Sequence, residues 1–367
     1  MDLSSIKKAI SRLLIVGFDG SSVRESHDLQ YLQQEDSLGG LVHFDLDVSS
    51  ISSKDSKNII NPIQVASLNY ELRQMFPLGL RSVDAEGGLD WIIQNGNKIR
   101  LGVNRLKPKY GFVETMDAAS IGGLYRTGNL SAIKKHCDII AGMIASAGFN
   151  CVYAPVVDLN INKECPIIGA MNRSYGDSID EVVGCANIFI DACHGVGVQT
   201  VLKHYPGHGS SVGDTHLGCV DVSNTWSSCE LEPFYALADK CGMVMMSHVI
   251  ARQVDSVPAS LSAKWIAKLR DSGFDGVVVS DDIQMQAIYA LGVGENELEI
   301  LTNIIIQALS AGNDMVIVGQ QQNALPMSKW DDLLSKLADA VVSGRLCADK
   351  LRYSTKRIEN MHAVFAN

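Results

Sequence analysis

Short apolar runs rich in β-branched residues alternate along the chain with longer amphipathic stretches. The short runs, which have the continuous apolar character of strands buried on both faces, cover residues 13–18, 41–44, 80–83, 152–155, 200–202, 243–246, 277–280 and 315–318. The longer stretches repeat their apolar residues with the period of a helix, and the clearest cover residues 131–147, 179–193, 262–271, 297–310 and 348–363. Strands that alternate with helices predict an α/β fold with a parallel sheet.

The residues at the helix ends support these boundaries. Ser262 begins one helical stretch and is a suitable N-cap, because its hydroxyl can accept a backbone N–H of the first turn. Four glycines, Gly148, Gly195, Gly273 and Gly312, each follow a helical stretch at the place where a glycine cap usually ends a helix. The N-terminal segment predicts a helical turn that leads into the first strand.

Two architectures share this alternation, a closed (β/α)8 barrel and an open doubly wound sheet. Polar residues after many strands favour the barrel, because several strand ends of a barrel contribute to one site. They are Asp19, Asp45, Asp84, Glu86, Asp158, Lys203, His204, Ser247, His248, Asp281 and Asp282. Turn formation alone would account for Asp19 and Asp45, but it accounts poorly for the Lys–His and Ser–His pairs.

No repeat, low-complexity tract or linker divides the chain. We therefore expect a single (β/α)8 domain over residues 1–367, with closing C-terminal helices and no second α/β domain. Residues 84–150 are long for one crossover between strands, so we expect them to hold irregular structure over the mouth of the barrel.

Composition limits the partners of the protein. The net charge of −10 disfavours a nucleic-acid binder, which needs a basic surface. No apolar run approaches the roughly 18 residues of a membrane span, and no cleavage pattern of a signal peptide follows the apolar segment near the N-terminus. The nine cysteines are scattered without a CxxC pair, as is usual for reduced thiols. We expect a cytoplasmic protein that binds neither nucleic acid nor membrane.

Residues 203–216, with the sequence KHYPGHGSSVGDTH, form the stretch richest in chemistry. Its histidines invite a zinc interpretation, since His204 and His208 are four residues apart. Pro206 and Gly207 oppose the helix that would place both rings on one face, although a loop can also hold a metal. The simpler interpretation, stronger for His208 than for His204, is that these rings bond to the surrounding chain. We expect no metal and no cofactor.

Asp214 and His216 stand two residues apart in the same loop, where their side chains can hydrogen-bond. The carboxylate would orient the ring and stabilise its protonated form. A histidine with a pKa near neutrality is an effective proton shuttle. We therefore expect this pair to act as a general acid and base.

A second stretch, residues 273–282, delivers two adjacent carboxylates, Asp281 and Asp282, at the end of a buried strand. Successive strand residues point to opposite sides, so only one carboxylate should face the barrel axis. We expect Asp281 to face it and Asp282 to cap the next segment; a capping role for both is the alternative.

A carboxylate nucleophile, a nearby proton donor and a Lys–His pair able to bind hydroxyls indicate glycosyl transfer to water. The same residue types would also suit an aldolase, in which Lys203 forms a Schiff base. The residues by themselves leave both reactions open.

These stretches resemble those of the family 3 glycoside hydrolases, and within that family the single-domain bacterial β-N-acetylglucosaminidases of peptidoglycan recycling. The resemblance covers most of the chain. It is carried by VDAEGG at 83–88, APVVDLN at 154–160, IG at 168–169 with RSY at 173–175, KHYPGHG with DTH at 203–216, SHV at 247–249, PAS at 258–260, the run from GFDG to Met285 at 273–285, and AGNDM at 311–315. The run KHYPGHG-x4-DTH is highly specific, and SDD preceded by GFDG is nearly so.

The resemblance implies a retaining exo-β-N-acetylglucosaminidase without a cofactor. Asp281 would be the nucleophile that forms a covalent glycosyl-enzyme, and His216, paired with Asp214, the acid/base. The residues that would bind the terminal sugar are Asp84, Arg173, Lys203, His204, His248 and Met285. The implied substrate is a β-linked N-acetylglucosamine glycoside, such as a muropeptide.

The chain departs from the family pattern where EGG usually continues as EGG-R-x-x-R. Leu89 and Ile92 replace those arginines, one of which normally helps to hold the sugar, and Trp91 offers a stacking face instead. Ala85 replaces a usual glutamine, and Thr215 conservatively replaces a usual serine.

Three other functions are compatible with the same site residues. A β-glucosidase would need no other catalytic residues, and a phosphorylase is compatible because a histidine repels an anionic acceptor less than a carboxylate would. A sugar-binding barrel that has lost turnover together with the arginines is the non-enzymatic alternative. The presence of every expected catalytic residue argues against that last alternative.

Overall fold

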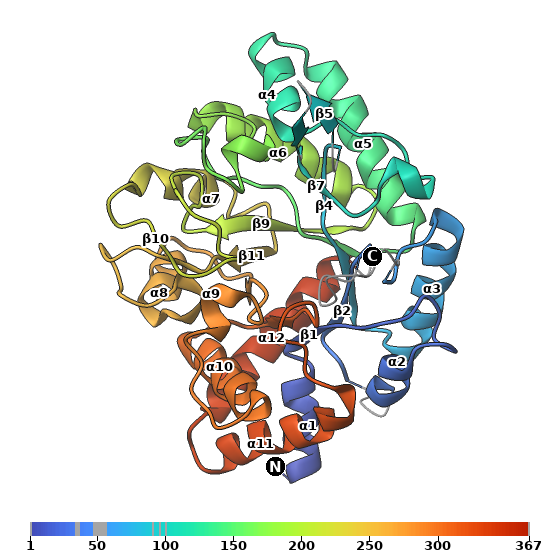
Figure 1. Cartoon of the computed structure of the whole chain (residues 1–367), viewed down its shortest axis with the longest axis vertical. Helices are drawn as coiled ribbons and strands as arrows, with labels where there is room; N and C mark the ends of the chain where they lie inside the picture. The colour runs from blue at the N-terminus through green and yellow to red at the C-terminus, as the bar shows by residue number, and fades with distance from the viewer. Residues whose placement is uncertain are drawn as a thin grey trace.

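The computed structural model describes residues 2–33, 37–46, 57–89, 92–94, 97–99 and 101–365. Eight strands form one sheet: β1 (Leu14–Gly17), β2 (Gly40–His43), β3 (Leu80–Val83), β8 (Cys151–Val152), β9 (Gln199–Tyr205), β11 (Met243–Met246), β13 (Val277–Ser280) and β14 (Val316–Val318). Neighbours in the chain are parallel neighbours in the sheet, and β1 also pairs with β14. A parallel bridge from Val279 to Met315 joins β13 to β14 and closes the sheet. The predicted (β/α)8 barrel is confirmed, and the doubly wound sheet is wrong (Figure 1).

Helices surround the strands (Figure 1). They are α1 (Leu3–Ser11), α2 (His27–Leu32), α3 (Pro62–Met75), α4 (Ala118–Arg126), α5 (Leu130–Ser146), α6 (Ile179–His194), α7 (Glu232–Ala236), α8 (Ala263–Asp271), α9 (Gln286–Tyr289), α10 (Glu297–Ala311), α11 (Trp330–Val342) and α12 (Ala348–Phe365). The five helices predicted from periodicity are α5, α6, α8, α10 and α12. Across the described ranges, we find no helix with the length and apolarity needed to cross a bilayer.

The helix ends follow the sequence with one correction. Ser262 caps α8, because its Oγ accepts the backbone N–H of Trp265 at 3.2 Å. Left-handed φ angles of 81°, 98° and 116° occur at Gly148, Gly273 and Gly312. The prediction for Gly195 is wrong: its φ is −60°, and its N–H still bonds within the helix to the carbonyl of Asp191. The chain reverses two residues later, where Gly197 has the left-handed φ of 75°.

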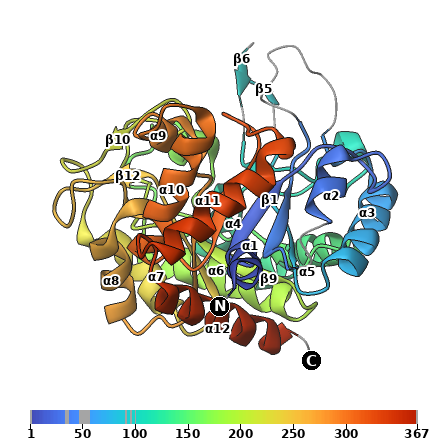
Figure 2. The same cartoon turned by 90° about the horizontal axis from the view of Figure 1, so that it is seen from below.

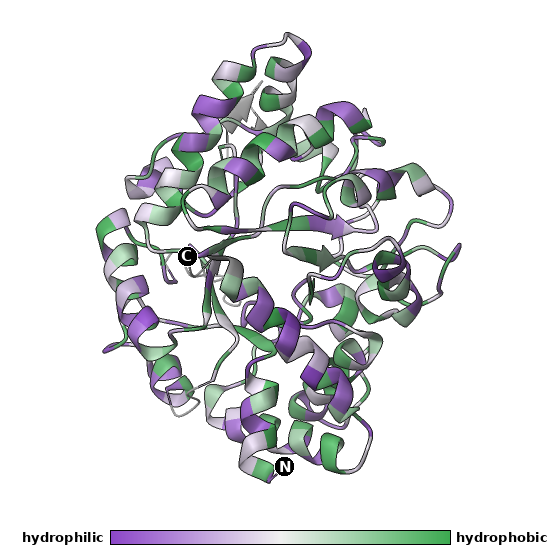
Figure 3. Cartoon of the chain, turned by 180° about the vertical axis from the view of Figure 1, so that it is seen from behind, coloured by the Kyte–Doolittle hydropathy of each residue, from purple (hydrophilic) through white to green (hydrophobic). Residues whose placement is uncertain are grey.

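Each barrel strand buries every one of its residues, and Figure 3 shows the hydropathy of these residues along the chain. In β13, Val277 and Val279 belong to the same buried cluster as Met245, whose side chain lines the barrel interior. The intervening Val278 belongs instead to the cluster that contains Ile266 of α8. This alternation has the period of two expected of a strand, and it directs the odd-numbered residues of β13 toward the barrel axis.

A polar cluster fixes the amino-terminal end of the barrel, which α12 covers (Figure 2). Asp314, just before β14, accepts hydrogen bonds from Arg270 Nη2 at 2.6 Å and from the backbone N–H of Val278 at 2.9 Å. Its other oxygen accepts one from Ser354 Oγ at 2.8 Å and lies 3.3 Å from Arg357 Nη1. One buried carboxylate therefore ties α8, β13 and α12 to β14.

The crossover from β3 to β8 holds irregular structure on the opposite side, as predicted. It contains β4 (Ala85–Gly87), β5 (Ile92–Gln94), β6 (Asn97–Ile99), β7 (Val103–Asn104) and the 3-10 turn η1 (Pro108–Tyr110) before α4. β4 pairs with β7 and β5 with β6, both antiparallel. Figure 2 shows the β5–β6 hairpin on the side of the molecule away from α12. Trp91 and the side chain of Ile92 lie outside the described part of the chain.

Candidate active site

A cavity of about 320 Å³ opens at the carboxyl ends of the strands, a size usual for small-molecule sites. Eight of the nine predicted site residues line it: Asp84, Arg173, Lys203, His204, Asp214, His216, Asp281 and Met285. Residues that surround them include Phe44, Arg105, Tyr153, Met171, Met245, Ile317, Gln321 and Gln322. The strands and loops of the whole barrel therefore contribute to one site, as expected for this fold.

Asp281 continues the inward-facing series of β13 beyond Val279. Its backbone N–H bonds to the carbonyl of Met246 at 2.9 Å, so the residue is still held by the neighbouring strand. Its Oδ1 accepts the backbone N–H of Asp282 at 2.8 Å. The Asp282 carboxylate, by contrast, accepts the N–H groups of Gln284 and Gly319, both at 3.0 Å. As predicted, Asp281 continues the inward-facing series and Asp282 caps the next segment, although both residues line the cavity.

The surroundings give the two carboxyl groups different acidities. Burial works to raise the pKa of Asp281, but the nearby rings of His248 and His204 outweigh it, and the net pKa lies below the usual value. Burial raises the pKa of Asp282 to about 6, against the opposing effect of the two N–H groups that it accepts. Asp281 is therefore the carboxylate that stays ionised over a wide pH range, as a nucleophile must.

The Asp214–His216 pair forms the predicted hydrogen bond. His216 Nδ1 lies 2.7 Å from Asp214 Oδ1, and the same oxygen accepts the His216 backbone N–H at 2.8 Å. The His216 side chain is 55% exposed, whereas Thr215 beside it is buried and its carbonyl accepts the N–H of Ala287. Burial works to raise the pKa of Asp214, but the hydrogen bonds from His216 outweigh this effect. The net pKa lies below the usual value, so the carboxylate is ionised. Nδ1 therefore carries the proton that Asp214 accepts, and Nε2 is left for proton transfer.

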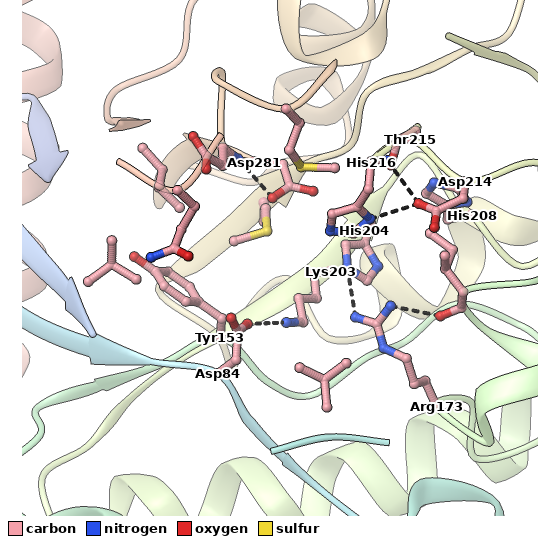
Figure 4. A pocket seen from close by; sticks show the side chains of 18 of the residues that line it. Asp84, Tyr153, Arg173, Lys203, His204, His208, Asp214, Thr215, His216 and Asp281 are labelled. Atoms are coloured by element: carbon pink, nitrogen blue, oxygen red, sulfur yellow. Dashed lines mark hydrogen bonds and ion pairs between the residues drawn. The ribbon is translucent and has the colours of Figure 1, made fainter. Parts of the chain in front are cut away.

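Figure 4 shows the Asp281 carboxylate and the His216 ring turned toward the same part of the cavity. His216 also contributes to the lowered pKa of Asp281, which indicates that the two groups interact across the cavity. A carboxylate on a strand and an oriented histidine on a loop thus face one space.

Glycines shape the loop that carries this pair. Gly207 has a left-handed φ of 118°, and a Cβ there would lie only 2.6 Å from the Cβ of Glu230. A Cβ at Gly209 would lie 1.8 Å from the carbonyl oxygen of Leu159. Both positions require glycine because no side chain fits between the loop and its support.

Four charged side chains form a network at the cavity wall, and three of them, Asp84, Arg173 and Lys203, line the cavity. Lys203 Nζ lies 2.9 Å from Asp84 Oδ1 and 2.7 Å from Glu86 Oε1. Arg173 donates from Nε and Nη2 to the two oxygens of Glu86 at 2.8 and 2.7 Å, a bidentate pair. Burial opposes ionisation throughout, but Arg173 and Lys203 lower the pKa of Glu86 to about 2. This network presents fixed charges to a polar ligand.

The same network decides against the aldolase alternative. Burial works to lower the pKa of Lys203, but the carboxylates of Asp84 and Glu86 reverse the effect and raise it above the usual value. A lysine that forms a Schiff base needs a lowered pKa, because only the neutral amine is nucleophilic. Lys203 is held as an ammonium ion, which suits it to binding hydroxyl groups.

His204 and His208 are both fixed by Asp158. His204 Nδ1 lies 2.7 Å from Asp158 Oδ2, and its Nε2 lies 3.3 Å from Arg173 Nη2. The backbone N–H of His208 donates to Asp158 Oδ1 at 2.8 Å, and its ring Nδ1 lies 2.9 Å from Ser211 Oγ. Burial lowers the pKa of His208 to about 4, so this ring is neutral and structural, as the simpler interpretation predicted. Within the described ranges, no three His, Cys, Asp or Glu side chains gather in a way that could hold a metal.

His248 lies behind the cavity wall rather than in it. Its Nδ1 is 2.8 Å from Ser260 Oγ, and its Nε2 is 2.9 Å from the carbonyl oxygen of Asp282. Burial lowers the pKa of His248. Nε2 donates its hydrogen to the carbonyl of Asp282, since a carbonyl oxygen can only accept. Both nitrogens are occupied by the protein, which fits a residue that holds the Asp281 segment in place.

Three further residues take part in the site that the sequence did not single out. Glu86 and Asp158 stood among the polar residues after strands, but nothing in the sequence showed that they would fix Arg173 and His204. Arg105 follows β7 and lines the cavity beside Asp84, and no sequence signal marked it.

Comparison with known proteins places the chain among sugar-cleaving enzymes. The family described as "Glycosyl hydrolase family 3 N terminal domain" matches residues 5–361. A β-hexosaminidase of Xylella fastidiosa (strain 9a5c) is 31% identical over 316 residues, which cover 83% of each chain. A β-hexosaminidase of Pseudomonas aeruginosa (strain LESB58) is 28% identical over 305 residues, 82% of this chain and 80% of the relative.

Solved structures show the same architecture. A glycoside hydrolase family 3 β-N-acetylglucosaminidase from Paenibacillus sp. str. FPU-7 superposes with a TM-score of 0.79 at 28% identity over 98% of this chain. The match spans 62% of the Paenibacillus chain. A β-N-acetylhexosaminidase from Beutenbergia cavernae shares the fold over 97% of this chain and 98% of its own, with a TM-score of 0.74 at 22% identity.

Proposed function

The chain belongs to glycoside hydrolase family 3, and on that premise we propose that it is a retaining exo-β-N-acetylglucosaminidase that works through Asp281 and His216. It releases terminal β-linked N-acetylglucosamine and forms a covalent glycosyl-enzyme on the way. The observation that carries the proposal is that one cavity brings together an ionised carboxylate at a strand end and an oriented Asp–His pair.

In the first step, the Asp281 carboxylate attacks the anomeric carbon. A bond forms between its oxygen and that carbon while the bond from the carbon to the leaving oxygen breaks. His216 gives the proton on Nε2 to the leaving oxygen, and Asp214 stabilises the protonated ring before the transfer. The products are a glycosyl ester on Asp281, the free aglycone and a neutral His216.

In the second step, water replaces the ester. His216, now neutral, takes a proton from water at Nε2, and the water oxygen bonds to the anomeric carbon as the ester bond breaks. Asp281 leaves as a carboxylate, and His216 is protonated again. Two displacements at one carbon give net retention of the β configuration.

The charged network supports recognition of the sugar hydroxyls. Lys203 and Arg173 donate hydrogen bonds, while Asp84 accepts them, and His204 is oriented by Asp158. We propose that these four side chains bind the terminal sugar together with Met285, and that His248 acts as a positioning residue. All of them come from the barrel strands and their loops, so we propose that this one domain suffices for activity.

We propose a cell-wall muropeptide with a terminal N-acetylglucosamine as the natural substrate, and the cytoplasm as its site of action. The support is the resemblance to the peptidoglycan-recycling branch of the family. Release of N-acetylglucosamine from purified muropeptides, and fractionation of cells that express the protein, test these two statements.

The nucleophile is tested by trapping. Wild-type protein treated with an activated, 5-fluorinated N-acetylglucosaminyl donor should accumulate a covalent adduct, and peptide mass spectrometry should place it on Asp281. Asp281→Ala should lose at least about a thousandfold in kcat with a normal melting temperature. Asp282→Asn is the matched control, and it should still form the adduct because its carboxylate caps backbone N–H groups. An adduct on Asp282 would overturn the assignment.

Substrate and acceptor are tested together. The 4-nitrophenyl β-N-acetylglucosaminide and the β-glucoside are compared with and without phosphate. We expect hydrolysis of the first, much less of the second, and no glycosyl phosphate. Preference for the glucoside would indicate a β-glucosidase, a glycosyl phosphate product would indicate a phosphorylase, and binding without turnover would indicate a sugar-binding barrel.

A further inference from the structure

The loop after β14 brings Gln322 to the cavity wall, and side-chain amides fix its backbone on both sides of that residue. Before Gln322, the buried Gln320 donates from Nε2 to the carbonyl of Leu325 at 2.7 Å, and its Oε1 accepts the N–H of Leu325 at 3.0 Å. The buried Gln284 accepts the N–H of Gln320 at 2.7 Å and donates to the carbonyl of Asn323 at 2.8 Å. The position of Gln322 is therefore set before any ligand arrives.

The amide of Gln322 is left for a ligand. Its Oε1 is buried, and the described part of the chain offers that atom no hydrogen-bond partner. Buried amide groups are nearly always hydrogen-bonded, because an unpaired one loses its hydration without replacement. Gln322 lines the cavity, so a bound molecule can supply the missing partner. An amide both donates and accepts, and a hydroxyl group of a ligand satisfies it in either sense.

The strand order divides the cavity into two halves of different chemistry. In the closed ring β13-β11-β9-β8-β3-β2-β1-β14, the strands β13 and β3 lie opposite each other. On one side of the line that joins them, β9 and the segment after β8 supply Lys203, His204 and Arg173. On the other side, the strands β14 and β2 and the turns directly after them supply only neutral lining residues, which are Val42, Phe44, Ile317, Gln321 and Gln322.

The proposed reaction decides which edge of the sugar meets each half. Asp281 of β13 approaches C1 from the α face, and the aglycone leaves toward the mouth of the cavity. Right-handed connections, the rule for parallel strands, make the strands follow one another anticlockwise when seen from their carboxyl ends. In a β-D-pyranoside, the atoms C1 to C5 run clockwise when seen from the β face. With C1 at the mouth and the α face toward β13, C2 and C3 lie in the charged half, and C5 and C6 lie in the neutral half.

We propose that Gln322 binds the C6 hydroxyl of the terminal sugar and thereby selects sugars with a free C6 hydroxymethyl group. Phe44 and Ile317 in the same half offer apolar contact to the C6 methylene. A sugar without this hydroxyl leaves the buried amide unpaired, so it is cleaved less well. This inference rests on the proposed function, since it takes Asp281 as the nucleophile that attacks a β-linked sugar.

The test compares Gln322→Met with wild type on two substrates, 4-nitrophenyl β-N-acetylglucosaminide and its 6-deoxy analogue. Wild type should cleave the analogue with a kcat/KM about 5- to 50-fold lower, because the amide loses its partner. Gln322→Met keeps the length of the side chain without its polar atoms. It should lose about the same factor on the parent sugar and less than about threefold on the analogue. Gln322→Ala should show the same pattern, and it carries the comparison if Gln322→Met does not fold.

Asn323→Gly is the matched control. The exposed Asn323 does not line the cavity, its φ of 50° suits glycine, and its Nδ2 donates to the carbonyl of Gln284 at 2.9 Å. The substitution disturbs the same loop without touching the sugar, so it should change kcat/KM by the same factor on both substrates. Equal cleavage of the two sugars by wild type, equal losses for Gln322→Met on both, or the selective pattern in Asn323→Gly would overturn the inference. Absence of hydrolysis of the parent sugar by wild type would instead overturn the proposed function.

Discussion

At the scale of single residues, Asp281 and His216 reach the cavity from different kinds of element, a buried strand and an exposed loop. Asp281 extends a buried strand and keeps a backbone hydrogen bond to Met246. His216 stands on an exposed loop, and among the described residues Asp214 is the only hydrogen-bond partner of its ring. The position of the proposed nucleophile is therefore fixed by the barrel, whereas the position of the proposed acid/base depends on a local hydrogen bond.

This dependence predicts that His216 and Asp214 act as a unit. His216→Ala should lower kcat/KM about 100- to 1,000-fold for alkyl glycosides, whose leaving group needs a proton, and far less for dinitrophenyl glycosides. Asp214→Ala should lower the same step, and the double variant should be little worse than His216→Ala, because both remove one function. Steady-state kinetics over a series of leaving groups measure these effects.

Azide provides the second readout for this pair. It needs no deprotonation, so it should restore turnover of the dinitrophenyl glycoside by His216→Ala and give a glycosyl azide of β configuration. Leu217→Ala, at an 81% exposed neighbour in the same loop, is the matched control and should behave as wild type. Equal losses for good and poor leaving groups, without azide rescue, would mean that His216 only shapes the loop.

The residues that could be predicted are those whose partners are close in sequence. Asp214 and His216 are two positions apart, and the strand period predicted that only one of Asp281 and Asp282 would face the axis. The contacts of Glu86 with Arg173 and of Asp158 with His204 join positions 87 and 46 residues apart. No pattern in one sequence pairs such positions, because the barrel closure alone brings them together.

At the scale of elements, the loop that carries Asp214 and His216 rests on the 3-10 turn η3 (Ser228–Leu231). Glu230 of this turn is fully buried, and its Oε1 accepts the backbone N–H of Ser227 at 3.2 Å. Its side chain packs against Gly207, which has no room for a Cβ. Burial raises the pKa of Glu230 to about 7, mainly because the ionised form loses its hydration.

The raised pKa predicts a dependence of stability on pH. The folded state binds a proton at Glu230 up to about pH 7, while the unfolded chain releases it near the usual pKa of 4.5. The stabilising contribution of protonated Glu230 to folding is fully present below pH 4.5 and is lost as the pH rises through about 7. Glu230→Gln removes this titration, so it should gain about 3 kcal/mol in unfolding free energy relative to wild type between pH 4.5 and 8.

Urea unfolding at several pH values measures this difference. Glutamine keeps an acceptor for the Ser227 N–H, so the cap survives the substitution. Glu232→Gln, at an exposed position two residues on, is the control and should show no such trend. A constant difference between Glu230→Gln and wild type over this range would show that Glu230 is ionised in the folded protein.

Among the elements, those with a clear apolar pattern could be predicted, and others, including the long helices α3 and α11, could not. The eight strands and the helices α5, α6, α8, α10 and α12 have apolar patterns that fix their type. Helices α7 and α9 have only five and four residues, too few to show a period. The β4–β7 pairing, which positions Arg105, involves three and two residues and depends on tertiary contacts.

At the scale of the whole molecule, the candidate site and the buried Asp314 cluster lie at opposite ends of the barrel. The proposed catalytic residues lie at the carboxyl ends of the strands, whereas Asp314 precedes β14 at the amino-terminal end and accepts a hydrogen bond from Ser354 of α12. The AGNDM motif that contributed to the family resemblance therefore belongs to the closure of the barrel. The family resemblance included motifs from both ends of the barrel. The structure shows which of these motifs lie at the carboxyl ends of the strands and which lie at the amino-terminal end.

This separation predicts a variant that loses stability and keeps activity. Asp314 is 1% exposed and bonds to α8, β13 and α12, so Asp314→Ala leaves Arg270 and Arg357 without their buried partner. Its unfolding free energy should fall by about 3 kcal/mol or more, while kcat of the folded fraction stays within about twofold of wild type. Asp275→Ala is the control, since its 84% exposed carboxylate pairs with the same Arg357 at 3.0 Å. A surface pair of this kind contributes at most about 1 kcal/mol. Equal destabilisation by the two substitutions in urea unfolding would show that Arg357, rather than the buried Asp314, holds α12 against the barrel.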